Sequence, residues 1–505
     1  MTTFAEPAPP RRARLTLTPG ELPGHAAELL DQGFRLALVG GHDDRPAGGG
    51  LRVVHLFTDP TTDTRTELHV PLDPATPHVP SLAALSFPAG RFERETRDLF
   101  GIVPDGHPLP RRLVRHFHWP RGWYPMRSDA GPPSAFGDVD GPYPFRTVDG
   151  AGVYEIPVGP VHAGMIGPGH FRFSVVGETV LKLKARLWFV HRGIEKHVEG
   201  RAPADALPIA ERISGDTTVG HALAFCQAVE EATGALVGAD ARVVRAVLLE
   251  LERLHNHAAD IGALCNDVGH GILNAHALRV REQLLRVNDR VSGHRLLRGA
   301  VVLGGTATVR LPDPAELAGI AADVAEIVDL ALGHSVVRDR FAGTAALTQQ
   351  QAADLGTLGY VARASGLTAD ARFDHPTVAG LPRHPSRVDA RGDVLARFLI
   401  RAEEFADSVA MISALVARPA AAAADHDQPQ PARGTASGVG IVEGWRGTIV
   451  HRVELGPEGT VRRLKVVDPS FLNWPALPVA LTGSIVPDFP LVNKSFNLSY
   501  AGNDL

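Results

Sequence analysis

The sequence predicts an α+β protein in which a small N-terminal α/β module precedes a mainly helical large domain edged by β-hairpins. Up to about residue 118, short apolar runs alternate with clusters of Gly, Asp and Pro, which is typical of strands joined by turns. From about residue 240, apolar residues recur three and four positions apart, as in amphipathic helices. Paired strand-like runs around Gly-containing turns flank these helices and predict the hairpins.

Composition suggests how the chain is divided. We expect residues 1–12 to be disordered and residues 13–120 to form the α/β module. Residues 121–150 are rich in Pro, Gly and Asp without periodicity, which predicts an ordered linker. Residues 151–505 then form the large domain, interrupted by a loop at 418–433, where a run of alanines is followed by Asp, Gln and Pro.

The same patterns place the individual elements. In the module, strands are expected at Phe34–Val39, Leu51–Phe57 and Thr66–Pro71. In the large domain, hairpins are expected from Phe171–Val176 with Thr179–Leu183, and from Thr448–Glu454 with Val461–Val467. Long helices are expected at Asp240–Cys265, Ala275–Leu297, Pro314–Leu332 and Val388–Val416. We expect the first two of these helices to turn an apolar face toward a partner protein.

Composition also excludes several functional classes. The formal net charge of -5 provides no basic surface for nucleic acid. There is no run of about 18 apolar residues and no apolar signal core, so we expect a cytoplasmic chain that can dock on a membrane-embedded partner. Cys226 and Cys265 form no CxxC pair and offer too few thiolates for a zinc site or an iron–sulfur cluster. Two buried thiols are expected rather than a disulfide.

Direct binding of NAD is not expected. The nearest approach to a dinucleotide-binding loop is Gly438-Val439-Gly440 with Gly444 downstream, which is one residue too long and leads into a strand. A phosphate cradle requires a helix N-terminus directly after the glycines.

Motifs in the first part of the chain resemble the 30 kDa subunit of respiratory complex I. They are Glu93-Arg94-Glu95, residues 98–102 (Asp-Leu-Phe-Gly-Ile), His107-Pro108-Leu109 and Arg111-Arg112-Leu113. Taken alone, these residues describe only a charged helix end, a Gly turn and a His-Pro loop.

A second set of motifs is similar to the 49 kDa subunit of complex I, and closer to the large subunits of formate hydrogenlyase and other group 4 [NiFe] hydrogenases. These motifs lie at residues 159–162, 168–173, 191–196, 211–216, 251–254, 260–263, 291–295, 468–471 and 475–477. The order of the two resemblances is that of formate hydrogenlyase-type fusions. The resemblance implies a subunit of a membrane oxidoreductase similar to NADH-quinone oxidoreductase or to these hydrogenases.

The resemblance also locates the nickel–iron ligands of the hydrogenases, which are two CxxC pairs. Here the first pair aligns with Ser214 and Thr217 and the second with Ser470 and Asn473. None of these side chains can replace a bridging thiolate at neutral pH, because soft thiolates stabilise the low oxidation states of the metals. A glutamate of the hydrogenase proton relay aligns with Gly167. We therefore expect no metal in this chain and no [NiFe] hydrogenase activity.

In complex I the corresponding cavity takes a quinone head group without a metal. The resemblance implies an Asp on the long helix, which is kept as Asp260, and a His on the first hairpin loop. His170 is a candidate for that His, although Pro168 aligns equally well. A Tyr that would donate to the quinone aligns near Gly215 and is missing. His170 and Asp260 are thus candidate cavity or proton-relay residues, and a solvated or salt-bridged Asp260 remains an equal alternative.

Three further residues, His191, Arg192 and Arg212, align with residues close to the terminal 4Fe–4S cluster of an adjacent small subunit. A cation there raises the cluster's potential by favouring its reduced, more negative state. A structural ion pair is an equal alternative for Arg212. The implied partners are an iron–sulfur small subunit, similar to the 20 kDa subunit of complex I, and antiporter-like membrane subunits. The implied cofactors are the partner's cluster and a quinone, with none held by this chain alone.

Two functions remain open at this point. The chain is either an oxidoreductase subunit that serves electron transfer to a quinone or another small acceptor, or a scaffold kept for assembly and conformational coupling. Neighbouring histidines offer no metal site. His255 and His257 point to different faces of one helix. His116 and His118 alternate on an expected strand and fit an interface better than a chelate.

Overall fold

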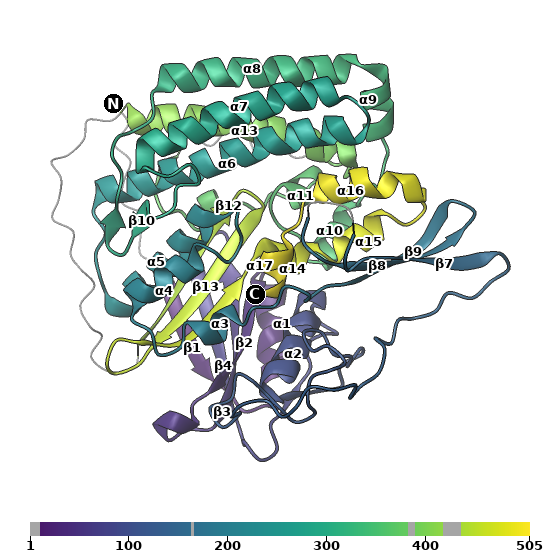
Figure 1. The fold of residues 1–505 in the computed structure, drawn as a ribbon. Helices are drawn as coiled ribbons and strands as arrows, with labels where there is room; N and C mark the ends of the chain where they lie inside the picture. Colours follow the sequence, from purple (N-terminus) through teal and green to yellow (C-terminus); the bar gives the residue numbers. More distant parts are fainter. Residues whose placement is uncertain (1–10, 163–165, 382–388, 418–435) are drawn as a thin grey trace.

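The computed structural model describes residues 11–162, 166–381, 389–417 and 436–505. The N-terminal module is a four-stranded sheet of order β1-β4-β3-β2, in which β1 runs parallel to β4 and the other neighbours are antiparallel (Figure 1). The three expected strands are confirmed, and β1 was not predicted. The module contains β1 (Arg11–Thr16), α1 (Leu22–Asp31), β2 (Arg35–Asp43), a 3-10 turn (Arg45–Ala47), β3 (Leu51–Asp59), β4 (Thr64–Leu72), β5 (His78–Pro80), α2 (Phe87–Phe100) and β6 (Val103–Asp105).

Two details of the module differ from expectation. Arg11 and Arg12, expected in a disordered terminus, lie in β1, and Arg12 donates to the buried Glu67 at 2.6 Å. His116 and His118 lie in a loop rather than on a strand, because His116 is held by the carbonyl of Trp188 at 2.8 Å. Residues 121–150 contain no helix or strand, as expected for the linker.

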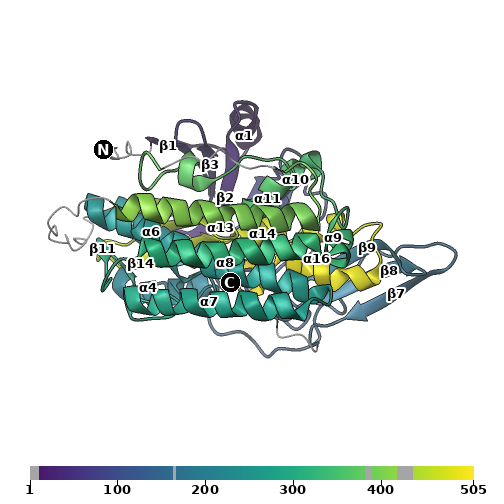
Figure 2. The same cartoon turned by 90° about the horizontal axis from the view of Figure 1, so that it is seen from above.

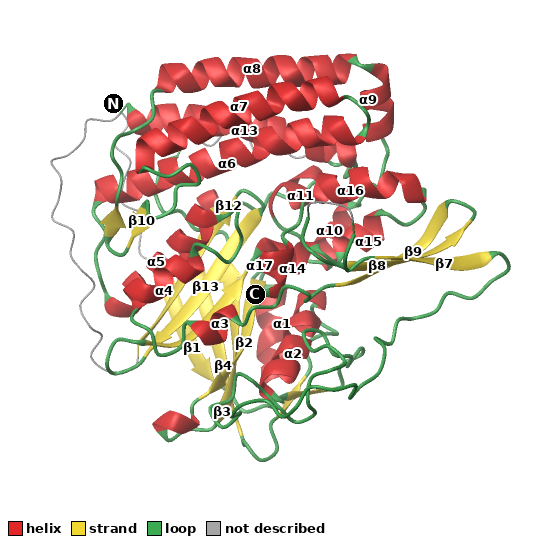
Figure 3. Ribbon diagram, in the orientation of Figure 1, coloured by secondary structure: helices red, strands yellow, loops and turns green. Residues whose placement is uncertain are grey.

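A second sheet lies between the module and the helices (Figure 3). It consists of β12 (Ala436–Gly444), β13 (Gly447–Leu455) and β14 (Val461–Val467), all antiparallel. The predicted second hairpin is confirmed as β13 and β14, and β12 is an additional strand that was not predicted. Gly438 and Gly440 lie in β12 because helix α5 (Thr218–Thr233) crosses it closely. A Cβ atom at either glycine would lie about 2 Å from a carbonyl oxygen of α5. The glycines therefore serve helix–sheet packing.

Four long helices, α6, α7, α8 and α13, form a bundle above this sheet (Figure 1), in which α6 and α8 each pack against both α7 and α13. Seen from above, α13, α8 and α7 lie side by side (Figure 2). Their bounds are Ala239–Asp267, Gly271–Ser292, Pro314–Gly333 and Val394–Val416. Helix α7 ends earlier than expected because Gly293 adopts a left-handed conformation with φ of 79°. Helix α13 begins later than expected, at Val394, because the Asp393 carboxylate caps it by accepting from the Ala396 N–H. Residue 388 and the expected loop at 418–433 lie outside the described residues.

Helix α6 corrects one further expectation. It was expected to face a partner, but it is mostly buried within this chain, against α7, α13, α5 and α16. Of the two helices expected to face a partner, α7 keeps the more exposed side, with large apolar side chains such as Ile272 and Leu278. No helix in the described ranges has both the length and the apolar character needed to cross a membrane.

The expected first hairpin is confirmed as β8 (His170–Val176) and β9 (Thr179–Arg186), which turn at the left-handed Gly177. A third strand, β7 (Val153–Val158), was not predicted, and the three-stranded sheet extends from one side of the molecule (Figure 1). The remaining elements are α3 (Ile194–His197), α4 (Pro203–Ala210), β10 (Val301–Val302), β11 (Gly305–Thr306), α9 (Ser335–Phe341), α10 (Gln349–Asp354), α11 (Gly359–Ala364), α12 (Ala371–Asp374), α14 (Pro469–Asn473), α15 (Ala476–Ala480), a 3-10 turn (Val486–Asp488), α16 (Phe489–Phe496) and α17 (Tyr500–Asp504).

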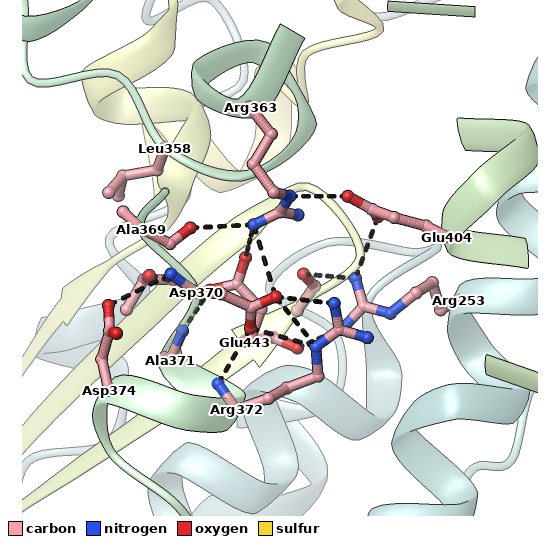
Figure 4. A network of polar contacts seen from close by, with 12 residues as sticks. Arg253, Leu358, Arg363, Ala369, Asp370, Ala371, Arg372, Asp374, Glu404 and Glu443 are labelled. Atoms are coloured by element: carbon pink, nitrogen blue, oxygen red, sulfur yellow. Dashed lines mark hydrogen bonds and ion pairs between the residues drawn. The ribbon is translucent and has the colours of Figure 1, made fainter. Parts of the chain in front are cut away.

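A buried network of charged side chains joins the helical layer to the central sheet (Figure 4). Arg363 of α11 donates to Glu404 of α13 at 2.7 Å and to Glu443 of β12 at 2.9 Å. Arg253 of α6 lies 3.7 Å from the same Glu404 carboxylate. Burial opposes ionisation of Glu404, but the nearby guanidiniums outweigh it and hold its pKa well below the ordinary value. The network therefore fixes α6, α11, α13 and β12 relative to one another.

Replacing Glu404 with Leu should destabilise the chain strongly, because it removes the buried carboxylate that Arg363, Arg253 and His257 share. Removing one partner of a buried pair costs about 3–5 kcal/mol. The expected result is a clearly lower urea midpoint of unfolding. Arg286→Gln is the control, because its ion pair with Glu282 on the surface of α7 is exposed, and it should leave the midpoint nearly unchanged. Equal effects of the two variants would contradict a structural role for the network.

Candidate functional site

The four positions that align with metal ligands are all buried and lie at the junction of α5, α14 and α17. The Ser214 hydroxyl lies 2.8 Å from the Ser499 hydroxyl, and the Ser499 N–H donates to the Ser470 hydroxyl at 3.0 Å. Thr217 accepts from the indole N–H of Trp445 at 3.1 Å. The structure thus brings Ser214 and Ser470 together through one intervening serine.

Asn473, the fourth position, supports the backbone instead. Its amide oxygen accepts from the Leu358 N–H at 2.8 Å and its amide nitrogen donates to the Leu358 carbonyl at 3.1 Å. This holds the start of α11 against the turn between β12 and β13. At Gly359, a Cβ atom would lie 2.0 Å from the carbonyl oxygen of Arg446 in that turn. Only glycine permits this approach, so Asn473 and Gly359 together position Arg446.

Arg446 forms the central ion pair of the site, with Asp216. Its Nη1 and Nη2 donate to the two carboxylate oxygens of Asp216 at 2.7 and 2.6 Å. The same carboxylate accepts from the hydroxyls of Ser214, at 2.8 Å, and Thr217, at 3.1 Å. The surrounding protein disfavours the charged carboxylate, but Arg446 and these hydroxyls outweigh that effect and hold the pKa of Asp216 well below its ordinary value. Asp216 is therefore an anion at neutral pH.

Sequence reasoning missed both members of this pair. The position of Asp216, between two hydroxyl residues at former ligand positions, was a usable signal. Arg446 carried none, because it lies 230 residues away from Asp216 in a two-residue turn.

These donors do not fit a nickel–iron centre. Hydroxyl and amide groups are neutral, hard ligands, whereas bridging two metals in low oxidation states requires thiolates. The two thiols of the chain lie elsewhere, on α5 and α6, and burial raises the pKa of Cys265 to about 12. In the described parts of the chain, no group of three or more His, Cys, Asp or Glu side chains could hold a metal ion.

Asp260 is buried and salt-bridged. Its carboxylate accepts from Arg401 Nε at 3.0 Å and from the Asn497 amide at 2.7 Å. The carbonyl of Asn497 accepts from Arg446 Nε at 2.6 Å. Asp260 is therefore joined to Asp216 by a continuous chain of side-chain and backbone hydrogen bonds. Of the interpretations left open from the sequence, a solvated acid is excluded by its 3% exposure.

His170 begins β8 and does not belong to this chain of hydrogen bonds. Its Nδ1 lies 3.0 Å from the Gly159 carbonyl, and its Nε2 has no partner among the described residues. The preceding Gly167 and Gly169 pack against the ring of Tyr500, the residue after Ser499. The His170 loop therefore borders the same region from another side.

His191, Arg192 and Arg212 are brought together at the surface beside the C-terminus. Arg192 donates to the carbonyls of Arg212 at 3.0 Å and Ile213 at 2.7 Å, directly before Ser214. His191 Nδ1 lies 2.7 Å from the Asp504 carbonyl. Burial lowers the pKa of His191, so its ring is neutral at pH 7. Both arginines are exposed, and neither forms an ion pair within the described residues. The structural ion pair considered for Arg212 is not found there.

Comparison with known proteins accounts for this arrangement. Residues 15–134 match the family described as respiratory-chain NADH dehydrogenase, 30 Kd subunit, and residues 267–437 match its 49 Kd subunit. Between them, residues 192–264 match the nickel-dependent hydrogenase family.

Two relatives share most of the chain. Formate hydrogenlyase subunit 5 of Escherichia coli is 31% identical over 94% of this chain and 85% of its own length. Hydrogenase-4 component G of the same organism is 33% identical over 82% of this chain and 73% of its own length. In fold, the chain is similar to a chain from the membrane-bound sulfane sulfur reductase, an archaeal respiratory membrane complex. That structure has a TM-score of 0.64 and 22% identity, and covers 70% of this chain and 98% of the other.

These matches agree with the fold. The protein is homologous to oxidoreductase subunits of hydrogenase and NADH-quinone oxidoreductase complexes. It belongs to the family of group 4 [NiFe] hydrogenase large subunits that fuse the 30 kDa and 49 kDa subunits of complex I, with the metal-binding cysteines lost.

Proposed function

We propose that the chain is the large subunit of a complex I-like oxidoreductase on the cytoplasmic face of a membrane. In this proposal it lies against an iron–sulfur small subunit, beside antiporter-like membrane subunits. It serves electron transfer from the partner's 4Fe–4S cluster to a quinone or another small acceptor, and it has no nickel–iron centre. The observation that carries the proposal is the pair of exposed, unpaired cations, Arg192 and Arg212, directly before Ser214.

The hydrogen-bonded chain from Asp216 to Asp260 supports the proposal by fixing the Asp260 carboxylate relative to the cationic surface. Reduction of a quinone consumes protons as well as electrons, and Asp260 is a carboxylate held by one arginine and one amide. His170 Nδ1 donates to the Gly159 carbonyl, so Nε2 of the neutral ring is an acceptor. It has no partner among the described residues and can receive a hydrogen bond from a bound small molecule. These groups are the proposed proton-relay and acceptor-binding residues.

A non-catalytic scaffold is the second candidate, and one observation favours it. Both carboxylates of the hydrogen-bonded chain are already neutralised internally, Asp216 by Arg446 and Asp260 by Arg401. A region saturated in this way can serve only to hold α5, α6 and α14 in place. The two candidates differ in whether Asp260 affects turnover.

The test of catalysis is the quinone reductase rate of the native complex carrying Asp260→Asn. We expect a loss of about tenfold or more, with the cluster's potential and iron content unchanged, because Asn is nearly isosteric but cannot hold a proton. Asp267→Asn, at the exposed end of the same helix, is the control. An unchanged rate in an intact Asp260→Asn complex would favour the scaffold.

The position of the partner's cluster is tested with Arg212→Met. At an effective dielectric near 20, a charge about 8 Å away contributes about 2 kcal/mol, or on the order of 90 mV for one electron. Solvent screening at this exposed site reduces the effect, so a fall of tens of millivolts in the cluster's midpoint potential is expected. Redox titration of its EPR signal measures this shift. Arg212→Lys should leave the cluster's midpoint potential close to that of the unaltered complex, because it keeps the positive charge. An unchanged potential in Arg212→Met would mean that the cluster lies elsewhere.

A further inference from the structure

A cavity of about 220 Å³ lies where α2 of the N-terminal module faces the end of β9 and helix α15 of the large domain (Figure 1). Its walls carry cationic and aromatic side chains, and none of its lining residues is an Asp or a Glu. The side chains used here are Phe87, Arg91, Arg94, Arg186, Trp188 and Trp474. The cavity is distinct from the Arg446–Asp216 site.

The three arginines of this cavity have no carboxylate partner among the described residues. Arg91 donates once, from Nη2 to Asn503 at 3.2 Å, and its buried Nε has no acceptor. Arg94 donates from Nε and Nη2 to neutral oxygens, which are two main-chain carbonyls and the Tyr143 hydroxyl. No hydrogen bond to a described residue uses its Nη1. Arg186 also donates only to main-chain carbonyls and lies over the Tyr143 ring at 4.7 Å.

This arrangement is unusual within the molecule. Other buried arginines of the described chain face carboxylates, as Arg245 faces Glu230 at 2.6 Å and Arg452 faces Glu67 at 2.9 Å. Arg397 also lacks a carboxylate, but all three of its nitrogens donate to oxygen atoms.

The positive charges of the cavity arginines also repel one another. Burial, together with the neighbouring Arg94, lowers the pKa of Arg91 to about 9, and burial lowers that of Arg186 to about 10. All three guanidiniums are nonetheless charged at neutral pH. Gathering such charges in a protein interior is unfavourable unless an anion compensates them.

We propose that this cavity binds a small organic oxyanion, a carboxylate or phosphate ester that carries a short apolar group. Its oxygens meet the unused N–H groups of Arg91 and Arg94, and its apolar part lies between Trp188 and Trp474. Paired guanidinium N–H donors match the geometry of carboxylate and phosphate oxygens.

The site is a binding site rather than a catalytic one. His107, the one lining histidine, accepts the Leu109 N–H at Nδ1 and contacts the Gly90 carbonyl through Nε2, so it is a fixed neutral tautomer. Because the walls come from both parts of the chain, the bound anion holds the N-terminal module against the large domain.

Isothermal titration of the full chain in its native complex tests the proposal, with phenyl phosphate and benzoate as probes. Saturable binding is expected, and Arg91→Gln should weaken it about tenfold or more. Arg97→Gln is the matched control, since Arg97 lies on the same helix but does not line the cavity. Arg91→Lys should retain part of the affinity, because it keeps the charge but loses the paired donors.

Two results would overturn the proposal. One is the absence of saturable binding by either probe, or equal binding by Arg91→Gln. The other is a large fall in the unfolding temperature of ligand-free Arg91→Gln. Such a fall would mean that the hydrogen bond to Asn503 and the contacts of the guanidinium with the Phe471 and Trp188 rings outweigh the like-charge repulsion, which would make the cation structural. Vesicles of phosphatidylglycerol distinguish the source of the anion. Arg91-dependent binding of vesicles assigns a lipid head group, and binding of the soluble probes alone assigns a free metabolite, each consistent with an oxyanion site.

Discussion

The bidentate ion pair between Arg446 and Asp216 organises the region that holds the metals in the related hydrogenases. It depends on three separate parts of the chain. Asp216 lies just before α5, Arg446 lies in the β12–β13 turn, and Asn473 of α14 fixes the backbone against which that turn packs. A guanidinium can bridge two carboxylate oxygens, and Arg446 does so with Asp216. Ser214, Thr217 and Ser470 belong to the hydrogen-bond network around this ion pair, and Asn473 supports it through the backbone of Leu358.

The outer surface beside this ion pair carries exposed cations. The exposed Arg192 and Arg212 and the neutral His191 lie next to Ser214. A partner docked there would therefore be close to the hydrogen-bond network around Asp216. The charge network around Glu404 holds α6 and α13 to the central sheet. It lies on the buried side of α6, away from solvent. Such buried ion pairs add rigidity more than stability, and rigidity is what the precise placing of electron carriers requires.

Local patterns predicted the strands β2, β3 and β4, both hairpins and the four long helices, because these elements are periodic and bounded by turn residues. The missed strand β1 is defined by a partner distant in sequence, β4, whereas β7 and β12 pair with the strands that follow them but are interrupted by proline or glycine. Burial of α6 could not be seen either, since its apolar face meets several helices of the same chain. At the site, motif alignment placed Ser214, Thr217, Ser470 and Asn473, whereas Arg446 and Asn497 act through contacts that no local pattern encodes.

The most direct measurement for this account is the metal content of the purified native complex, determined by mass spectrometry together with hydrogen uptake. The account predicts iron from the partner's cluster, no stoichiometric nickel and no hydrogen uptake, because Ser214, Thr217, Ser470 and Asn473 supply no thiolate. About one nickel per chain, bound at this junction and accompanied by hydrogen uptake, would contradict it.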